Sequence, residues 1–167
     1  MKYIRLTQGK FAKVDDEDFN WLKQWKWCAE HKGKAFYAVR NAKNEKKIIH
    51  IYMHREILKK YYPLLLIGKI VDHKDGDSLN QLKTNLRIAT QRENVRNQKI
   101  QVRHTGFKSS KFKGVRWHKR NKKWIASIQI MGRSKHLGYY DNEVEAAQAY
   151  NEAAQKAFGD FARLNTF

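Results

Sequence analysis

The chain has 167 residues, with 35 Lys and Arg against 16 Asp and Glu, and its formal net charge is +19. This length supports one medium domain or two small ones, and a content of 41% apolar and 13% aromatic residues excludes a fully disordered basic tail. The charge predicts a polyanionic partner, with nucleic acid favoured over an anionic membrane surface.

Membrane and redox features are sparse. The longest purely apolar run covers residues 64–67, far short of a membrane-spanning helix, and no apolar signal segment follows Met1. Cys28 is the only cysteine, which excludes an internal disulfide and a cysteine-based zinc site. We therefore expect a cytoplasmic protein that is not secreted, with no membrane partner and no structural zinc.

Residues 1–53 alternate short β-like runs with one helix. The β-like runs cover residues 3–6, 36–40 and 47–52. The helix is expected to begin near Asp15 or Asp16, because clustered acidic side chains favour a helix N-terminus. The pattern predicts an N-terminal α+β region and assigns no functional residue to it.

Residues 54–97 predict a helix followed by a strand, a turn, a strand and a second helix. The first helix is expected over residues 53–60, with Pro63 limiting its extension. A β-like run over 70–73 enters a turn marked by Asp-Gly, a second run covers 86–90, and a polar helix covers 91–98. Residues 98–110 form a basic linker, either a solvated connector or a strap along a phosphate backbone.

Residues 111–167 predict a three-stranded antiparallel sheet packed on one helix. The β-like runs are 114–118, 124–131 and 135–140, with Gly132 in a hairpin turn. The helix begins at Asn142, which has capping-box spacing to Glu145, and Gly159 can end it. Four residues recur on its expected buried face: Ala147, Tyr150, Ala154 and Ala157.

The pair Asp72-His73 is the strongest candidate for chemistry. An Asp beside a His is often only structural, but three amides follow at Asn80, Asn85 and Asn94. Carboxylate and amide oxygens suit Mg²⁺, which takes few protein ligands and completes its shell with substrate phosphate oxygens. A histidine, with an ordinary pKa near about 6.5, can take a proton from water. Together these groups predict phosphodiester hydrolysis.

The stretch from Val71 to Asn94 resembles the HNH nuclease motif, in the form common in phage and intron-encoded homing endonucleases. The resemblance implies a ββα-metal core in which His73 is the general base and Asn85 braces the metal loop. It also implies that Asp72 and Asn94 ligate a divalent metal. Asn94 stands where the letters of the motif have histidine, which favours Mg²⁺ or Mn²⁺ over softer ions.

Residues 111–165 resemble the plant Apetala/ethylene-response-factor DNA-binding domain, which implies a sheet laid into the major groove. Arg116 and Trp124 occupy positions that this family uses for base and sugar-phosphate contacts, and alternation places His118 on the face of Arg116. The basic residues expected on phosphates are Arg120, Lys122, Lys123, Arg133 and Lys135. Trp124 has an alternative role in the core, and residues 119–123 an alternative role as a solvated hairpin.

The sequence therefore predicts an α+β protein with a ββα-metal nuclease core before a three-stranded sheet on one helix. We expect a metal-dependent, site-specific DNA endonuclease of the HNH homing type that hydrolyses double-stranded DNA, nicking one strand per active site. It would act as a monomer or a DNA-induced dimer in a bacterial host cell, encoded by a phage or mobile element. A catalytically silent, sequence-specific DNA-binding regulator and an RNA-binding protein are the alternatives.

Overall fold

The computed structural model describes residues 1–44, 47–97 and 110–167. The chain divides into two compact units, Met1–Asn94 and Val95–Phe167. The expected basic linker lies outside the described residues except for Ser110, which is buried. Within the described part of the chain, no helix is long and apolar enough to span a membrane.

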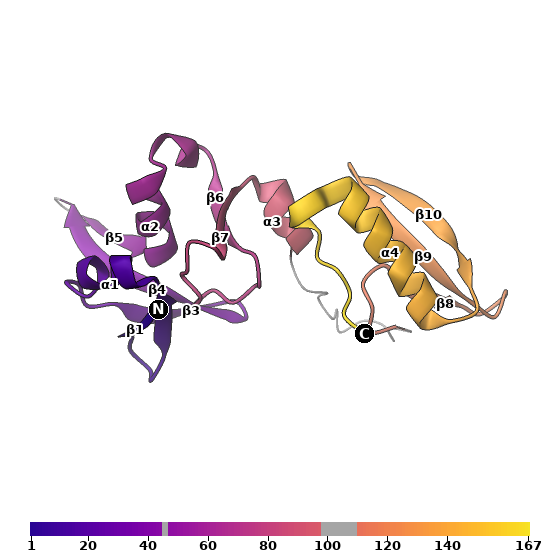
Figure 1. The fold of residues 1–167 in the computed structure, drawn as a ribbon, viewed down its shortest axis with the longest axis horizontal. Helices are drawn as coiled ribbons and strands as arrows, with labels where there is room; N and C mark the ends of the chain where they lie inside the picture. The colour runs from indigo at the N-terminus through magenta and orange to yellow at the C-terminus, as the bar shows by residue number, and fades with distance from the viewer. Residues whose placement is uncertain (45–46, 98–109) are drawn as a thin grey trace. The chain divides into compact units, whose positions relative to one another are not determined.

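The first unit is built from small antiparallel sheets and short helices (Figure 1). Its sheets, within the described residues, are β1 (Lys2–Arg5) with β2 (Phe11–Val14), then β3 (Cys28–Lys32), β4 (Ala35–Asn44) and β5 (Lys47–Tyr52), and then β6 (Ile70–His73) with β7 (Leu86–Ala89). Its helices are α1 (Asp16–Leu22), α2 (Met53–Tyr61), the short 3-10 turn η1 (Leu64–Leu66), and α3 (Gln91–Asn97), which crosses the boundary between the units.

One apolar cluster holds the first unit together. Leu22 from α1, Met53 and Ile57 from α2, and Trp27 are almost completely buried in it. The Trp27 indole N–H donates to the carbonyl of Leu22 at 2.8 Å, so this large side chain leaves no unpaired donor in the core. The helix start at Asp16 and the helix from Met53 agree with the sequence pattern, whereas β2 and β3 were not predicted.

The second unit is a three-stranded antiparallel sheet packed on one helix, as expected. The strands are β8 (Val115–His118), β9 (Lys123–Ile130) and β10 (Arg133–Tyr140) in the order β10-β9-β8, and the helix is α4 (Glu143–Phe158), followed by the 3-10 turn η2 (Gly159–Phe161). Ala147, Tyr150 and Ala154 are buried against the sheet, but Ala157, in the last turn of α4, is exposed, and its expected burial is wrong. The small side chains let the helix lie close to the strands.

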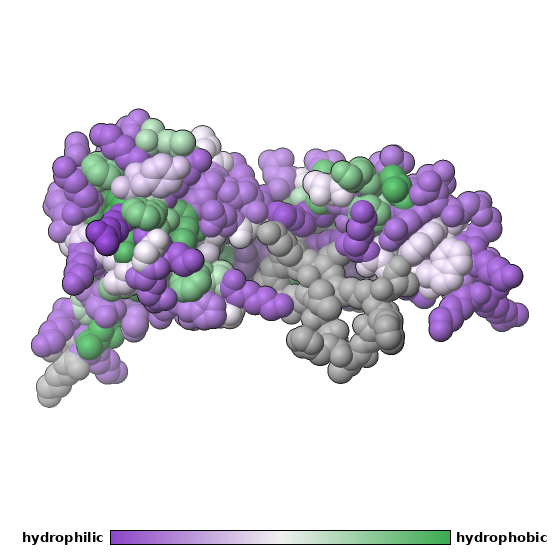
Figure 2. All heavy atoms as spheres, turned by 90° about the horizontal axis from the view of Figure 1, so that it is seen from below, coloured by the Kyte–Doolittle hydropathy of each residue, from purple (hydrophilic) through white to green (hydrophobic). Residues whose placement is uncertain are grey.

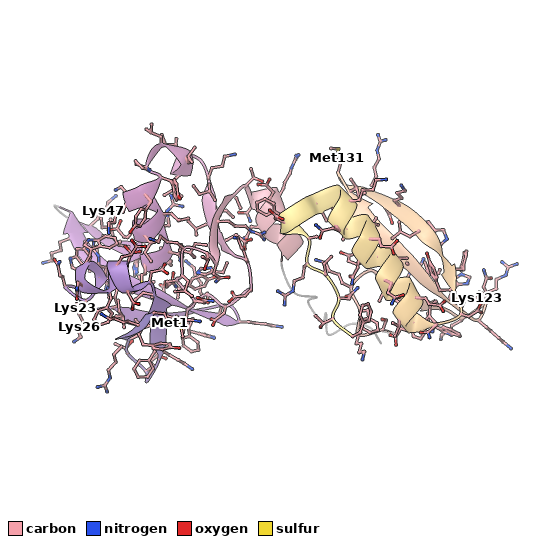
Figure 3. The ribbon with its side chains drawn as sticks, viewed as in Figure 1. Met1, Lys23, Lys26, Lys47, Lys123 and Met131 are labelled. Atoms are coloured by element: carbon pink, nitrogen blue, oxygen red, sulfur yellow. The ribbon has the colours of Figure 1, made fainter. Side chains whose placement is uncertain are left out.

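Turn and cap residues define the ends of these elements. Met131 and Gly132 both have positive φ, 51° and 81°, as a two-residue hairpin turn between β9 and β10 requires. Figure 3 shows Met131 at this turn and Lys123 at the opposite end of β9. The Asn142 side chain accepts a hydrogen bond from the Val144 N–H at 2.8 Å, which confirms the predicted helix start.

Candidate active site and nucleic-acid interface

An ion pair between neighbouring strands fixes the carboxylate of Asp72. Asp72 on β6 lies opposite Arg87 on β7 in the antiparallel register. Nε and Nη2 of Arg87 approach the same oxygen, Oδ2 of Asp72, at 2.8 and 2.6 Å, and the two side chains are only 10% and 6% exposed. In this buried position the guanidinium compensates the charge of the carboxylate, which holds Asp72 in one orientation.

His73, the next residue of β6, is buried against a second histidine. The rings of His54 and His73 meet edge to face, with centroids 5.2 Å apart. Burial lowers the pKa of His73 below its usual range, although Gln81 and nearby carboxylates oppose the shift. Burial, with His73 and Arg55 adding to it, lowers the pKa of His54 to about 3. Both rings are therefore neutral at pH 7, the state in which a histidine can accept a proton.

The Asn85 side chain braces the long loop that joins β6 to β7 (Figure 1). Its Oδ1 accepts from the backbone N–H of Asp75 at 3.1 Å, while its Nδ2 donates to the Asp75 carboxylate at 3.0 Å and to the Asn80 carbonyl at 2.9 Å. Asn80 in turn donates to Asp75 at 2.7 Å. Burial opposes ionisation of Asp75, but these hydrogen bonds and one from the Asp77 backbone outweigh it and lower its pKa.

Backbone pairing fastens this loop to the N-terminal hairpin. The Lys13 N–H donates to the Leu79 carbonyl at 2.9 Å, and the Gln81 N–H donates to the Lys13 carbonyl at 2.8 Å. Gln81 is completely buried, and its Nε2 donates to the Ser78 carbonyl at 2.7 Å. A rigid Gln81 can therefore hold the imidazole of His73 in one orientation, as its effect on the pKa of His73 indicates.

A capping box sets the start of α3. Thr90 and Glu93 exchange hydrogen bonds: Glu93 Oε2 accepts from the Thr90 N–H and hydroxyl, both at 2.7 Å, and the Glu93 N–H donates to Thr90 Oγ1 at 3.3 Å. Asn94 follows in this helix, half-buried, with its backbone N–H donating to the Thr90 carbonyl. The cap therefore fixes the direction of Asn94 relative to the end of β7.

The metal ligands that the sequence predicts are oxygen donors. Among the described residues, no group of three or more His, Cys, Asp or Glu side chains could enclose a metal ion. Asp72 and Asn94 would supply two hard oxygen ligands, a set that fits Mg²⁺ or Mn²⁺ with water and phosphate oxygens in the remaining positions.

In the second unit, β-sheet register divides the expected DNA-binding residues between two faces. Arg116 pairs with Ile125 and His118 with Lys123, so these four share the face opposite α4. Tyr139 lies on the same face, with its ring 5.7 Å from that of His118 and 4.8 Å from that of His136. Arg116, His136 and Tyr139 are exposed, and this combination of a cation with flat rings can contact a nucleic-acid groove.

Among the other expected contacts, Lys123 shares the face of Arg116, and the rest lie elsewhere on the second unit. Trp124 pairs with Trp117, with the ring centroids 5.1 Å apart. It packs on the apolar cluster that Ala126 forms with residues of α4. Arg133 and Lys135 pair with Ile130 and Ile128 of β9 and so belong to the α4 side of the edge strand, where both are exposed. Arg120 and Lys122 are exposed in the β8–β9 turn, and Lys123 forms an ion pair with Asp141 at 2.8 Å.

Comparisons with known proteins agree with both units. A family model described as HNH endonuclease matches residues 52–96, and one described as AP2 domain matches residues 110–160. Over 163 residues the chain is 32% identical to a protein of Acanthamoeba polyphaga mimivirus named uncharacterized HNH endonuclease L560, and the match covers 95% of this chain and 76% of that one. The chain belongs to the HNH endonuclease family. It is also 31% identical over 97 residues to Protein 3.8 of Escherichia phage T7, covering 58% of this chain and 76% of the phage protein.

This HNH endonuclease contains site residues to which the sequence analysis gave no role. Arg87 contacts the Asp72 carboxylate and Gln81 interacts with His73, and the only sequence signal for Arg87 is its place in a strand opposite an acid. The Thr90-x-x-Glu93 spacing is a recognisable capping box. The HNH and AP2 domains make DNA the partner of the family, and the protein is an HNH-family nuclease.

Proposed function

We propose that the first unit cleaves duplex DNA one strand at a time, as a metal-dependent nuclease with a ββα-metal core. The observation that carries this proposal is the order β6, braced loop, β7, capped α3. It sets Asp72 and His73 on one strand and Asn94 on the following helix. Buried Asp-His pairs in general serve structural roles too, but here the neighbouring loop and helix add the amides that oxygen-ligated metal sites use.

The chemistry follows from the protonation state of His73. Because burial keeps this imidazole neutral at pH 7, it can take a proton from the attacking water. The water oxygen forms a bond to phosphorus while the bond from phosphorus to the 3′ oxygen breaks. The leaving 3′ oxygen takes a proton from a solvent water, so the products are a 5′-phosphate and a 3′-hydroxyl. Asp72 and Asn94 would hold Mg²⁺ or Mn²⁺, which, when bound, stabilises the charge on the phosphate and the leaving oxygen. With one general base and one metal ion, each active site would cleave one DNA strand.

The second unit would select the DNA site. Arg116, His118 and Tyr139 would face the major groove, since a small antiparallel sheet fits a groove about 12 Å wide. Arg120 and Lys122 would bind phosphates from the β8–β9 turn, as would the edge-strand residues Arg133 and Lys135 and, after leaving Asp141, Lys123. Trp124 would support the sheet from the α4 side. Figure 2 shows a largely hydrophilic face on both units, which agrees with a nucleic-acid partner.

A nuclease in the first unit, with site selection by the second unit, would make this a homing-type enzyme. The mimivirus relative, matched along 95% of this chain, supports the combination of both units. We expect a monomer to nick its site and two copies, assembled on DNA, to be needed for a double-strand break. Competition between duplex DNA, single-stranded DNA and RNA at one salt concentration separates this function from RNA binding.

Strand-break mapping on phage genomic DNA tests the proposal. Wild-type protein should give breaks at discrete positions with Mg²⁺ and none with EDTA. His73→Ala should bind the same DNA without breaking it, whereas His31→Ala, which removes an exposed histidine of β3, should cleave normally. DNA that is bound but left intact by the wild-type protein in Mg²⁺ and Mn²⁺ would contradict the nuclease proposal and favour a regulator.

A further inference from the structure

Three large apolar side chains protrude from the connection between α2 and β6. Leu64, Leu65 and Ile67 are 79%, 61% and 76% exposed. Between them Leu66 is only 6% exposed and belongs to the apolar cluster of the first unit. In Figure 1 this connection is the highest part of the first unit as drawn. Solvent exposure of several neighbouring aliphatic residues usually marks a binding surface.

Three hydrogen bonds restrain the connection. The Tyr62 N–H donates to the Leu58 carbonyl at 2.7 Å, which joins the segment to the end of α2. The Lys69 N–H donates to the Leu66 carbonyl at 3.2 Å, and Nη1 of Arg55 donates to the Lys69 carbonyl at 3.1 Å. With Leu66 buried as an anchor, the exposed side chains are presented on a preorganised turn, so little conformational entropy is lost when they bind.

The charge around the turn identifies its partner as a polyanion. No Asp or Glu occurs between Glu56 and Asp72, while Arg55, Lys59 and Lys69 are exposed beside the turn. Arg55 and Lys59 also line a hollow of about 430 Å³ that Ile67 borders. Glu56 lines it too, and its carboxylate is paired with Arg40 at 3.1 Å. A second copy of the chain would bring cations against cations here, which opposes self-association, whereas DNA supplies both phosphates for the cations and an apolar stack of bases.

The turn is close to the candidate active site along the chain. Leu65 and Leu64 are eight and nine positions from His73, which limits the distances from their Cα atoms to that of His73 to about 29 and 32 Å. The longer distance corresponds to about nine base pairs of duplex. A side chain on the turn can therefore reach the same stretch of DNA as the catalytic strand.

We propose that Leu64 and Leu65 insert between base pairs as an apolar wedge next to the scissile phosphate, with Arg55 and Lys59 holding the flanking phosphates. This inference rests on the proposed cleavage of duplex DNA by the first unit. Aliphatic side chains inserted from the minor groove unstack one base step and kink the duplex by about 20–90°. The kink would bring the scissile phosphate within reach of the buried Asp72-His73 strand, which a straight duplex keeps away from it.

The test uses full-length protein on the duplex in which nick mapping finds the cut, with 2-aminopurine placed at each position within about nine base pairs of it. Wild-type protein should raise the fluorescence severalfold at one step, because the probe brightens when it unstacks. Leu64→Ser/Leu65→Ser should lose this rise and nick at least about tenfold more slowly. The matched control Ile48→Ser/Ile49→Ser removes two exposed aliphatic residues of β5 and should keep both signals.

A rescue experiment separates the wedge from general damage. A duplex with a mismatch or an abasic site at the unstacked step is already deformed, so it should restore nicking by Leu64→Ser/Leu65→Ser to within about threefold of wild type. Wild-type protein that nicks DNA without a fluorescence rise at any position would overturn the wedge and leave the nuclease intact. Nick mapping that finds no cut with the wild-type protein would instead refute the proposed cleavage, on which the wedge rests.

Discussion

Replacing Arg87 tests whether the buried ion pair holds Asp72 in place. In Arg87→Ala the carboxylate of Asp72, 6% exposed, loses both guanidinium contacts at 2.6 and 2.8 Å. Leaving one partner of a buried pair uncompensated costs about 3–5 kcal/mol, so the β6–β7 hairpin should open about 150-fold more often or more. Hydrogen exchange of peptides that cover residues 70–89 measures this opening separately from the second unit.

The control for this prediction is Arg40→Ala. Arg40 pairs with Glu56 at 3.1 Å, outside the β6–β7 hairpin, with side chains 16% and 22% exposed, and its removal should cost about 1–2 kcal/mol without affecting residues 70–89 selectively. If Asp72 is also a metal ligand, Mg²⁺ should restore more protection in Arg87→Ala than it adds to wild type, because the cation replaces the lost positive charge. A loss of protection below about 1 kcal/mol in Arg87→Ala would refute the reasoning.

Three further predictions concern pH and the second unit. Because burial lowers the pKa of His73, the nicking rate should stay constant from pH 8 to 7 and fall only with a midpoint below 6.5; a midpoint at or above 6.5 would contradict a buried base. Gly114→Ala should destabilise the second unit by about 2–4 kcal/mol in chemical denaturation, because the new Cβ would lie 2.0 Å from the Tyr150 ring at a φ of +77°. In Gly132→Ala, at a φ of +81°, the new Cβ would have nothing within 4 Å, so the unfolding free energy should fall by only about 1 kcal/mol. Equal losses of unfolding free energy in the two variants would exclude the clash. Asn165→Ala removes two side-chain hydrogen bonds to the backbone of Lys113, at 2.6 and 3.1 Å, and should lower the unfolding free energy by about 1–3 kcal/mol; an unchanged midpoint would show that the C-terminal segment does not support the sheet.

Local sequence signals predicted the second unit well. The Gly132 turn, the Asn142 cap and the alanine face of α4 each act within a few residues, so the pattern specifies them directly. In the first unit, β2 and β3 are strands of four and five residues whose identity depends on pairing with other segments. Short strands of this kind carry little periodicity, which is why the sequence did not predict them.

The candidate site shows the same division between local and non-local information. Asp72, His73 and the loop residue Asn85 could be chosen from one short stretch of sequence. The residues that contact these three side chains could not be predicted in this way, because each contact depends on three-dimensional packing. Arg87 faces Asp72 through strand register, and His54 meets His73 only because α2 packs beside β6.

The two units bury separate apolar clusters, one around α2 and the others against α4, and each cluster draws its residues from a single unit. An exchange of coding sequence near the boundary between the units would therefore leave both interiors closed. One recombination event could then exchange the AP2 domain while the HNH domain stays unchanged. The two domains can in this way diverge at independent rates.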